Sequence, residues 1–325
     1  MRRVLVITNN LDQASFRVRM SVLVGPLRAR GIDLDVHVRP RGMRARRRLL
    51  RTASSYDAVV LQRKFLDPGD ARLLQRASRK IIYDIDDALM FQQKPAGLIE
   101  RWRTRRRFTA TANVVDVVVA GNEYLADIFR QRGSETIVLP TVVDVSRYAI
   151  KRHVQTDTPR LVWIGSRSTL GYLNLIYPAL AAARRTLPGL RLVVIADAAP
   201  VDAPLPVDFV RWSESTESQS LAGGDIGIAP TPDDAWTRGK CGFKIVQYLA
   251  TGLPVIASPV GANTTLVQPS VTGFLPASQD EWTSAVLQLA GDASMRELMG
   301  QRGRALAEES LSLERALDVW ERLLA

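Results

Sequence analysis

Strand-like and helix-like patterns alternate along almost the whole of this 325-residue chain, and the alternation limits the folds open to it. Short runs of valine, isoleucine, leucine and alanine are typical of strands buried on both faces of a parallel sheet. Longer stretches with apolar residues at three- and four-residue steps, typical of helices, separate these runs. Strands that alternate with helices give parallel sheets with right-handed crossovers, so an α/β fold is predicted.

The alternation stops near the middle of the chain and then starts again. Residues 140–160 contain Lys151-Arg-His153 and Thr156-Asp-Thr-Pro159, a polar, proline-containing composition that is typical of a linker. The predicted strands are residues 4–8, 32–38, 58–62, 80–84, 114–120 and 136–139 before it, and 161–164, 190–196, 209–212, 226–229 and 255–257 after it. The predicted helices are residues 15–30, 43–54, 68–78, 97–112 and 122–132 before it, and 169–186, 215–222, 242–251, 279–290, 293–309 and 312–325 after it.

The chain is too long for one average domain, and two domains of about 150 residues are expected. We predict two Rossmann-like, doubly wound domains at residues 1–148 and 160–311, a linker at 149–159, and a last helix at 312–325. Such domains bind ligands beyond the carboxyl ends of their strands, so both sites are expected to face one cleft.

Positive charge is concentrated in the first half of the chain. The net charge is +11, and residues 1–150 hold 28 of the 44 basic residues but only 15 of the 33 acidic ones. One cluster runs from Arg39 to Arg48 and another from Arg101 to Arg107. Such clusters attract anionic lipid head groups, although they also occur as solvated helix faces of arginine-rich proteins. We expect an anionic membrane surface or acceptor as a partner. Nucleic acid is not expected, because no nucleic-acid-binding motif accompanies the charge.

The single cysteine, Cys241, excludes an internal disulfide and is typical of a reducing cytosol. No apolar run reaches the length that a transmembrane helix needs. The N-terminus, Met-Arg-Arg followed by a predicted strand, does not resemble a signal peptide. The expected location is therefore the cytoplasm, with peripheral attachment to the inner face of the plasma membrane as an alternative.

Two lysines lie at the start of a predicted helix, where cations are unfavourable. Lys240 and Lys244 lie at or just before the first turn of the helix predicted at residues 242–251. The N-terminus of a helix carries partial positive charge, and its unpaired N–H groups bind anions. A phosphate or diphosphate between the lysines would explain their position. Two solvated lysines with buried stems are an equal alternative.

A small-residue turn elsewhere in the second half fits the same ligand. Trp163-Ile-Gly-Ser-Arg-Ser-Thr169 passes from a strand into a helix, and Gly165 allows a ligand to approach the backbone closely. The cation for a phosphate there would come from the segment Arg238-Gly-Lys-Cys-Gly-Phe-Lys244. The hydroxyl groups beside the N–H groups of that helix belong to Ser166, Ser168 and Thr169.

Two stretches of the first half also carry candidate side chains. Tyr83-Asp-Ile-Asp-Asp87 closes a predicted strand, and carboxylates this close together are typical of metal sites, base sites or helix caps. Asp87 as the cap of the following helix is the structural alternative. After the first strand, Ser15 is a candidate N-cap, which would place Arg17 and Arg19 in a first turn and again suit an anion. No G-x-G-x-x-G sequence follows that strand, so a dinucleotide site is not expected.

Several motifs, in order along nearly the whole chain, resemble the retaining GT-B glycosyltransferases of family 4. Five segments resemble general motifs of the family: Gly121-Asn-Glu-Tyr-Leu125, Leu139-Pro-Thr-Val-Val-Asp144, Gly252-Leu-Pro-Val-Ile-Ala-Ser258, Gly261 and Thr272-Gly-Phe-Leu275. Three further segments resemble motifs of a bacterial branch of the family: Tyr83-Asp-Ile-Asp-Asp87, Trp163-Ile-Gly-Ser166 and Gly239-Lys-Cys-Gly-Phe-Lys-Ile-Val-Gln-Tyr-Leu-Ala250.

The resemblance implies a glycosyltransferase of the hexosyltransferase type, EC 2.4, with the GT-B fold. The second domain would bind a nucleotide-diphosphate sugar, a UDP- or GDP-sugar. The first would bind the acceptor, which is a glycan, a lipid-linked sugar or a small molecule. Transfer would retain the anomeric configuration, with no metal and no cofactor besides the nucleotide-sugar co-substrate. The last helix would cross back onto the first domain, as is usual in this fold.

The sequence departs from the family at its signature residues. The two signature glutamates fall on Gly239 and Gln247, and the first-domain histidine falls near Asp86. Gln247 still offers an acceptor for ribose hydroxyls, and Asp233 or Asp234 is a candidate to hold sugar hydroxyls. Neither histidine of the chain is a candidate catalytic group, because one lies in a predicted strand and the other in the linker.

These patterns give a set of predicted site residues. Breaking the bond between sugar and diphosphate places negative charge on the diphosphate, which fixed cations and helix N–H groups stabilise. The predicted catalytic residues are Lys244, Lys240 and Asp86. The predicted donor-binding residues are Gly165, Ser166, Ser168, Thr169, Arg238, Lys240, Lys244, Gln247 and Asp234. The predicted acceptor-side residues are Ser15, Arg17, Arg19, Asp84, Asp87 and Glu123, and no metal ligand is predicted.

Two other functions fit parts of the pattern. A sugar-nucleotide epimerase of the same fold would need acids and bases around the sugar ring and would have no use for a basic first domain. A non-catalytic protein that binds nucleotide sugars or a membrane surface would account for the loss of both signature glutamates. Donor turnover with and without an acceptor separates the three functions.

Overall fold

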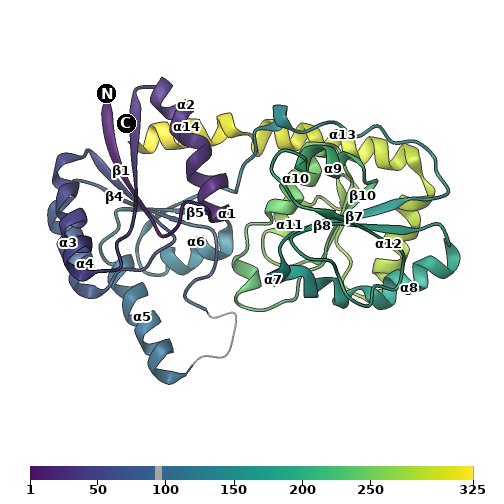
Figure 1. Ribbon diagram of the computed structural model, residues 1–325, viewed down its shortest axis with the longest axis horizontal. Coiled ribbons are helices and arrows are strands. Elements are labelled where there is room, and N and C mark those ends of the chain that lie inside the picture. The colour runs from purple at the N-terminus through teal and green to yellow at the C-terminus, as the bar shows by residue number, and fades with distance from the viewer. Residues whose placement is uncertain (92–96, 325) are drawn as a thin grey trace. The chain divides into compact units, whose positions relative to one another are not determined.

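The computed structural model describes residues 1–91 and 97–324, and the chain divides into two compact units. Unit 1 comprises Met1–Val142, Asp234–Cys241 and Leu313–Ala325, and unit 2 comprises Val143–Asp233 and Gly242–Ser312. Figure 1 shows a sheet with helices on both of its faces in each unit. The segment Asp234–Cys241, which lies in the second half of the sequence, thus belongs to unit 1.

Unit 1 is built on a parallel six-stranded sheet with the strand order β2-β1-β3-β4-β5-β6. The strands are β1 (Arg2–Thr8), β2 (Ile32–Val38), β3 (Ala58–Gln62), β4 (Ile81–Ile85), β5 (Val117–Ala120) and β6 (Glu135–Val138). The helices are α1 (Ala14–Phe16), α2 (Val22–Ala29), α3 (Met43–Thr52), α4 (Pro68–Ala77), α5 (Leu98–Ala112), α6 (Glu123–Arg130) and α14 (Leu313–Leu324). A π-helical turn, Arg17–Ser21, joins α1 to α2.

The sheet of unit 1 is buried on both faces because successive side chains of a strand point to opposite sides. Along β1, Leu5 and Ile7 belong to the core that α3, α4, α5 and α6 cover. Val4 and Val6 belong to the opposite core, which α2 and α14 cover and to which α14 contributes Trp320. The continuous apolar sequence of the strands therefore reflects a doubly wound sheet.

Unit 2 repeats this architecture with the strand order β12-β11-β10-β7-β8-β9, again parallel. The strands are β7 (Arg160–Ile164), β8 (Arg191–Ala196), β9 (Val207–Arg211), β10 (Ile226–Ala229), β11 (Val255–Ala257) and β12 (Gly273–Phe274). The helices are α7 (Arg167–Leu170), α8 (Tyr177–Thr186), α9 (Glu217–Ala222), α10 (Phe243–Thr251), α11 (Asn263–Leu266), α12 (Gln279–Gly291) and α13 (Ala293–Ser310). Core residues from α8 and α12 cover one face, those from α9, α10 and α11 cover the other, and α13 contributes Met299 to the first core and Ala307 to the second.

The predicted α/β fold with two doubly wound domains is confirmed, three local predictions need correction, and two short elements were not predicted. The helix predicted at 169–186 is broken, because Pro178 lies at the start of a new helix, α8, after a 3₁₀ turn. The predicted cap at Ser15 is wrong, since α1 begins at Ala14 and Ser15 lies inside it. Asp87 does not cap α5, whose N-cap is Gly97. β12 and α11 were not predicted, because elements so short carry no periodic pattern.

Candidate functional site

A lysine and a tryptophan meet at the carboxyl end of the sheet of unit 2. Trp163 is fully buried in β7, and the ammonium of Lys244 lies 4.2 Å from the centroid of its ring. This separation suits a cation–π interaction, which holds the ammonium over the indole. Lys244 is the second residue of α10, which begins after Gly242 in a left-handed conformation with φ 61°. The predicted cation at the start of this helix is therefore fixed by the strand beneath it.

Tyr248, one turn after Lys244, attaches α10 to the sheet. Its hydroxyl accepts a hydrogen bond from the Ile164 N–H at 3.1 Å and donates one to the Ile228 carbonyl at 3.1 Å. A Cβ atom on Gly227 would lie 2.5 Å from the tyrosine ring, so only glycine lets the ring pack there. These contacts place the first turn of α10 beside the ends of β7 and β10.

The turn after β7 lies beside the same tryptophan. A Cβ atom on Gly165 would come within 2.5 Å of the Trp163 indole, which explains the glycine. The hydroxyls of Ser166 and Ser168 lie 2.8 Å apart, and the Thr169 hydroxyl lies 3.2 Å from the Ser166 carbonyl, to which it donates. The predicted hydroxyl groups are thus gathered in one turn, where they can also bond to a phosphate oxygen.

A carboxylate that the sequence did not reveal lies at the same turn. The N–H of Arg167, the first residue of α7, donates to Asp197 at 2.6 Å. Asp197 directly follows β8, so its place at the carboxyl end of a predicted strand was the available signal. Because the Asp197 carboxylate already occupies the Arg167 N–H group, a phosphate is not expected to bind there. The groups of this region that favour a phosphate are therefore Lys244 and the hydroxyls of the turn.

Gln247 is almost completely buried rather than presented to solvent. Its amide nitrogen lies 3.5 Å from the Tyr148 hydroxyl, which donates to Glu217 at 2.9 Å. Trp212 donates to the same carboxylate at 2.7 Å. Burial, and then the charge of Glu217, raise the pKa of Tyr148. The predicted contact of Gln247 with a ribose stays a prediction, and the buried network around it was not visible in the sequence.

The loops after β10 and β11 are joined by a second polar network. The Thr231 N–H donates to the Ser258 hydroxyl at 3.0 Å, and the Asn263 amide donates to the Ser258 carbonyl at 2.9 Å. These groups link two neighbouring loops at the carboxyl edge of the sheet, where open α/β sheets bind ligands.

In unit 1, the predicted acceptor-side residues Arg19 and Asp84 form a buried ion pair. The guanidinium donates to the carboxylate of Asp84, with the shortest N–O distance 2.6 Å, and also to the Leu139 carbonyl at 3.1 Å. Burial alone would lower the pKa of Arg19, but the charge of Asp84 and its hydrogen bonds outweigh burial and raise the pKa of Arg19. The charges of both residues are thus directed at each other in the core rather than at a ligand.

Arg63, which the sequence did not single out, links the other two carboxylates of this motif. It follows β3 and adopts a left-handed backbone conformation with φ 52°. Its guanidinium lies 3.3 Å from Asp86 and donates to Asp87 at 2.6 Å. Burial, and then the nearby Asp86, raise the pKa of Asp87. A non-glycine residue with positive φ at the end of a strand is typical of functional sites.

The segment Asp234–Cys241 is held to unit 1 by Asn122, the N-cap of α6. The Asn122 amide donates to the carbonyls of Arg238, at 3.2 Å, and of Lys240, at 2.9 Å. The Lys240 ammonium lies 3.7 Å from Asp87. Lys240 and Lys244, which were predicted to bind one diphosphate together, therefore belong to different units.

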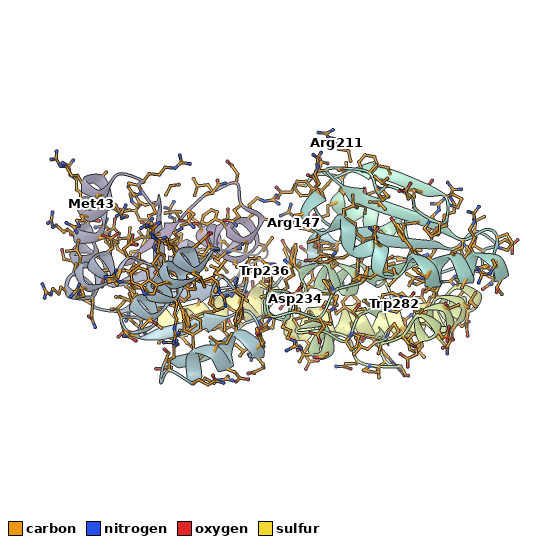
Figure 2. All side chains as sticks on the ribbon, turned by 90° about the horizontal axis from the view of Figure 1, so that it is seen from below. Met43, Arg147, Arg211, Asp234, Trp236 and Trp282 are labelled. Atoms are coloured by element: carbon orange, nitrogen blue, oxygen red, sulfur yellow. The ribbon has the colours of Figure 1, made fainter. Side chains whose placement is uncertain are left out.

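Asp234 and Trp236 lie on the same segment (Figure 2). The Asp234 carboxylate accepts from the Thr237 N–H at 2.8 Å, so it stabilises the 3₁₀ turn at Thr237–Gly239. The Lys240 ammonium lies 5.6 Å from the centroid of the Trp236 ring. The structure thus brings Lys240, Asp86 and Asp87 together in unit 1, whereas Asp234 has a local structural contact.

The remaining predicted residues lie elsewhere in unit 1. The Ser15 hydroxyl is buried and has no hydrogen-bond partner within the described part of the chain. Arg17 begins the π-helical turn, and Glu123 pairs with Arg130 of its own helix at 2.6 Å. Within residues 1–91 and 97–324, no group of three or more histidine, cysteine or acidic residues could hold a metal ion.

Comparison with known proteins gives a family match for the second half of the chain. Residues 158–292 match the family described as glycosyl transferases group 1. This range covers the Trp163 turn, Lys244 and most of unit 2. No curated protein sequence matches the chain.

Solved structures resemble all or most of the chain. Anabaena HepE, in complex with UDP and glucose, matches with a TM-score of 0.75 at 16% identity, over 100% of this chain and 99% of that one. Sucrose-phosphate synthase from Thermosynechococcus elongatus matches with a TM-score of 0.73 at 14% identity, over 99% of this chain and 98% of that one. The pneumococcal O-GlcNAc transferase GtfA, in complex with UDP and GlcNAc, matches with a TM-score of 0.61 at 14% identity, over 86% of this chain and 58% of that one.

Likeness at these identities shows the fold, and the predicted GT-B fold with two Rossmann-like domains is confirmed. The group 1 match over residues 158–292 adds chemistry to that fold. Together the match and the fold support a glycosyltransferase.

Proposed function

We propose that this chain transfers a hexose from a UDP- or GDP-sugar to an acceptor, with retention of anomeric configuration and without a metal ion. The observation that carries the proposal is the position of Lys244 over Trp163, beside the Gly165 turn, at the carboxyl end of the sheet of unit 2. This is the edge at which doubly wound sheets bind nucleotides. The range that matches glycosyl transferases group 1 contains all three residues.

In the proposed reaction, the bond between the sugar C1 and the diphosphate oxygen breaks, and negative charge develops on the diphosphate. Lys244 and the hydroxyls of Ser166, Ser168 and Thr169 would stabilise that charge where it forms. The acceptor hydroxyl attacks C1 on the face that the diphosphate leaves, and its proton passes to a leaving phosphate oxygen. The products are the nucleoside diphosphate and the glycosylated acceptor, so no strong protein base is needed.

We propose that Asp86 holds the acceptor. Its Oδ1 atom is buried and has no hydrogen-bond partner among the described residues, although the Arg63 guanidinium lies 3.3 Å away. An acceptor hydroxyl is a suitable donor to this oxygen, because a buried carboxylate oxygen without a hydrogen bond is costly. Lys240, next to Asp87, would add positive charge on this side.

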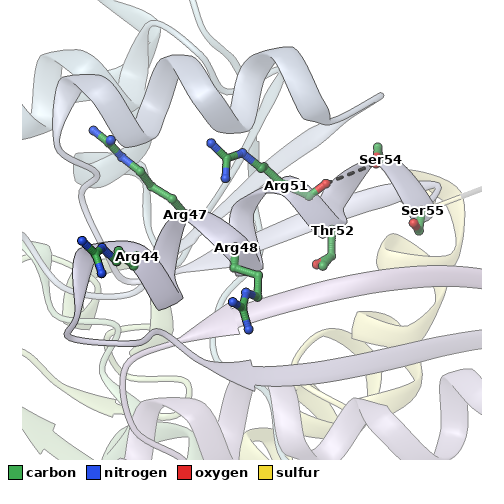
Figure 3. A pocket seen from close by; sticks show the side chains of 7 residues that line it. All are labelled: Arg44, Arg47, Arg48, Arg51, Thr52, Ser54 and Ser55. Atoms are coloured by element: carbon green, nitrogen blue, oxygen red, sulfur yellow. Dashed lines mark hydrogen bonds between the residues drawn. The ribbon is translucent and has the colours of Figure 1, made fainter.

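We also propose an anionic membrane surface as a partner of unit 1. Arg44, Arg47, Arg48 and Arg51 of α3, with Thr52, Ser54 and Ser55, line a hollow of about 530 Å³ (Figure 3). Arg39 and Arg46 of the first cluster lie beside Asp70, and Arg47 lies 3.8 Å from the same carboxylate, whereas no ion pair is formed by Arg44, Arg48 or Arg51 within the described residues. The exposed side of α3 is therefore the part of that cluster that suits lipid phosphates.

The test is donor turnover by the purified chain in the presence of a chelator. UDP- and GDP-hexoses are supplied with and without a glycan or lipid extract, and the anomeric configuration of the product is read by NMR. We expect an acceptor-dependent product with the donor configuration, and a loss of roughly 100- to 1,000-fold in kcat for Lys244→Ala. An inverted product, a requirement for metal, or donor epimerisation without an acceptor would contradict the proposal.

A further inference from the structure

One end of α5 exposes large apolar side chains. Leu98 is 82% exposed, Ile99 is 69% exposed and Trp102 is 58% exposed. Single apolar residues are common on protein surfaces, but three on adjacent turns form a patch that needs an explanation. Figure 1 shows that α5 extends away from the other helices of unit 1.

The apolar side chains share one side of the helix. With about 3.6 residues per turn, Leu98, Ile99 and Trp102 fall within a sector of about 100°. The buried residues of α5 are Phe108, Thr111 and Ala112, near its other end. On the same helical geometry, the centre of the buried face lies about 140° from the centre of the apolar sector. The exposed sector therefore points away from the core of unit 1.

Arginines surround this sector. The Arg106 guanidinium lies 5.2 Å from the centroid of the Trp102 ring. Glu100 is the only acidic residue of α5, and Arg107 pairs with Asp67 at 2.7 Å. Within the part of the chain that the structure describes, no ion pair is formed by the other arginines of this helix, Arg101, Arg103, Arg105 and Arg106.

We propose that the first turns of α5 anchor the protein in an anionic phospholipid bilayer. Leu98, Ile99 and Trp102 would enter the boundary between head groups and acyl chains, and the arginines would contact lipid phosphates. None of the described helices is long and apolar enough to cross a membrane, so α5 would lie at its surface. A second copy of the chain suits the patch less well, because it would oppose arginine with arginine.

The inference rests on the membrane association proposed for the glycosyltransferase and adds the residues that enter the bilayer. α5 is the helix that follows β4 along the chain, and Asp86 and Asp87 directly follow that strand. In a parallel sheet, the crossover helix begins on the side of the carboxyl ends of the strands. The anchor would therefore bring the proposed acceptor-binding edge of unit 1 to the bilayer, as a lipid-linked acceptor requires.

The test uses the full chain and vesicles of phosphatidylcholine with and without phosphatidylglycerol. The variant with Leu98→Ser, Ile99→Ser and Trp102→Ser changes only exposed side chains, so its melting temperature should equal that of the wild type. We expect its binding to anionic vesicles to fall by at least about tenfold, since even one buried apolar side chain contributes that much. Leu298→Ser, a change at a leucine of α13 that is 48% exposed, is the matched control and should bind as the wild type does.

A second readout reports insertion itself. Trp102 emission should shift to the blue on vesicle binding and be quenched by brominated acyl chains. Trp102→Phe should lose this signal and keep most of the binding. Unchanged binding of the triple variant, or binding without the Trp102 signal, would overturn the proposal. So would self-association of the wild type that the triple variant abolishes.

Nucleotide binding in the absence of vesicles separates this inference from the proposed function. If only the anchor proposal is wrong, UDP or GDP still raises the melting temperature of the wild type and of the triple variant, although the two bind vesicles equally. If only the donor-site proposal is wrong, no nucleotide raises the melting temperature of any variant, although the wild type still binds anionic vesicles.

Discussion

Replacing Asp84 with alanine would leave the guanidinium of Arg19 in the core of unit 1 without its counter-ion. The side chains are 3% and 0% exposed, and the guanidinium makes hydrogen bonds of 3.0, 3.1 and 2.6 Å to the carboxylate. Removal of one partner of a buried pair costs about 3–5 kcal/mol, because the other charge stays buried and uncompensated. For a domain of this size, each kcal/mol lowers the melting temperature by roughly 2–4 °C. We therefore expect unit 1 of Asp84→Ala to melt about 6–20 °C below the wild type.

Differential scanning calorimetry measures this change. The matched control is Asp208→Ala in unit 2, where Asp208 pairs with Arg191 but both side chains are more than one-third exposed. Exposed ion pairs contribute little, so the control should melt close to the wild type. The double change Arg19→Met with Asp84→Leu should recover part of the loss, because no unpaired charge stays behind. If Asp84→Ala melts no lower than Asp208→Ala, the inference that Arg19 and Asp84 form a stabilising buried ion pair is wrong. A ligand-binding role for Asp84 then becomes the better explanation.

Three further predictions concern single positions. Burial raises the pKa of the Cys241 thiol, so a thiol reagent at pH 8 should react slowly with the native chain and rapidly in urea; fast native labelling would contradict this. Burial lowers the pKa of His153, whose Nε2 lies 2.9 Å from the Gly252 carbonyl. Its contribution to stability should be complete above about pH 6.5 and be lost as the pH falls toward the folded-state pKa. His153→Gln should therefore flatten the pH dependence of melting between about pH 5 and 7, and an unchanged slope would refute this. Gly165→Ala would place a Cβ atom 2.5 Å from the Trp163 ring and should cost about 1–3 kcal/mol of stability by overpacking. Circular dichroism melts test it, and an unchanged midpoint would show that the indole moves aside.

The architecture could be predicted from the sequence because burial on both faces leaves a strong local pattern. The run from Ala58 to Leu61 is apolar throughout, and with Gln62 it forms a strand with the predicted bounds. The start of α10 was predicted within one residue, and its end at Gly252 follows from a left-handed glycine with φ 75°. Where a boundary depends on a single turn, as at Ala14, the local pattern gave the wrong first residue.

The candidate site was harder to predict, since it depends on pairings between distant residues. Arg19 and Asp84 are separated by 65 positions, and no local pattern shows that they neutralise each other. Arg63 was missed because its positive φ and its contacts with two carboxylates arise only when β3 and β4 are adjacent. Lys240 was predicted to lie at or just before the first turn of α10, but it belongs to unit 1, where the Asn122 amide donates to its carbonyl.

The most direct measurement is the binding of UDP, GDP, ADP and TDP, with a chelator present, to the wild type, Lys244→Ala and Arg185→Ala. Arg185 is an exposed cation in the last turn of α8, so its variant removes one charge from unit 2 away from the carboxyl ends of the strands. Ligand at about 100 times its dissociation constant adds roughly 2.7 kcal/mol of stability, which a thermal shift detects readily. We predict a shift with UDP or GDP that persists in Arg185→Ala and is largely lost in Lys244→Ala. No shift with any nucleotide, or an equal shift in Lys244→Ala, would contradict a diphosphate site at Lys244.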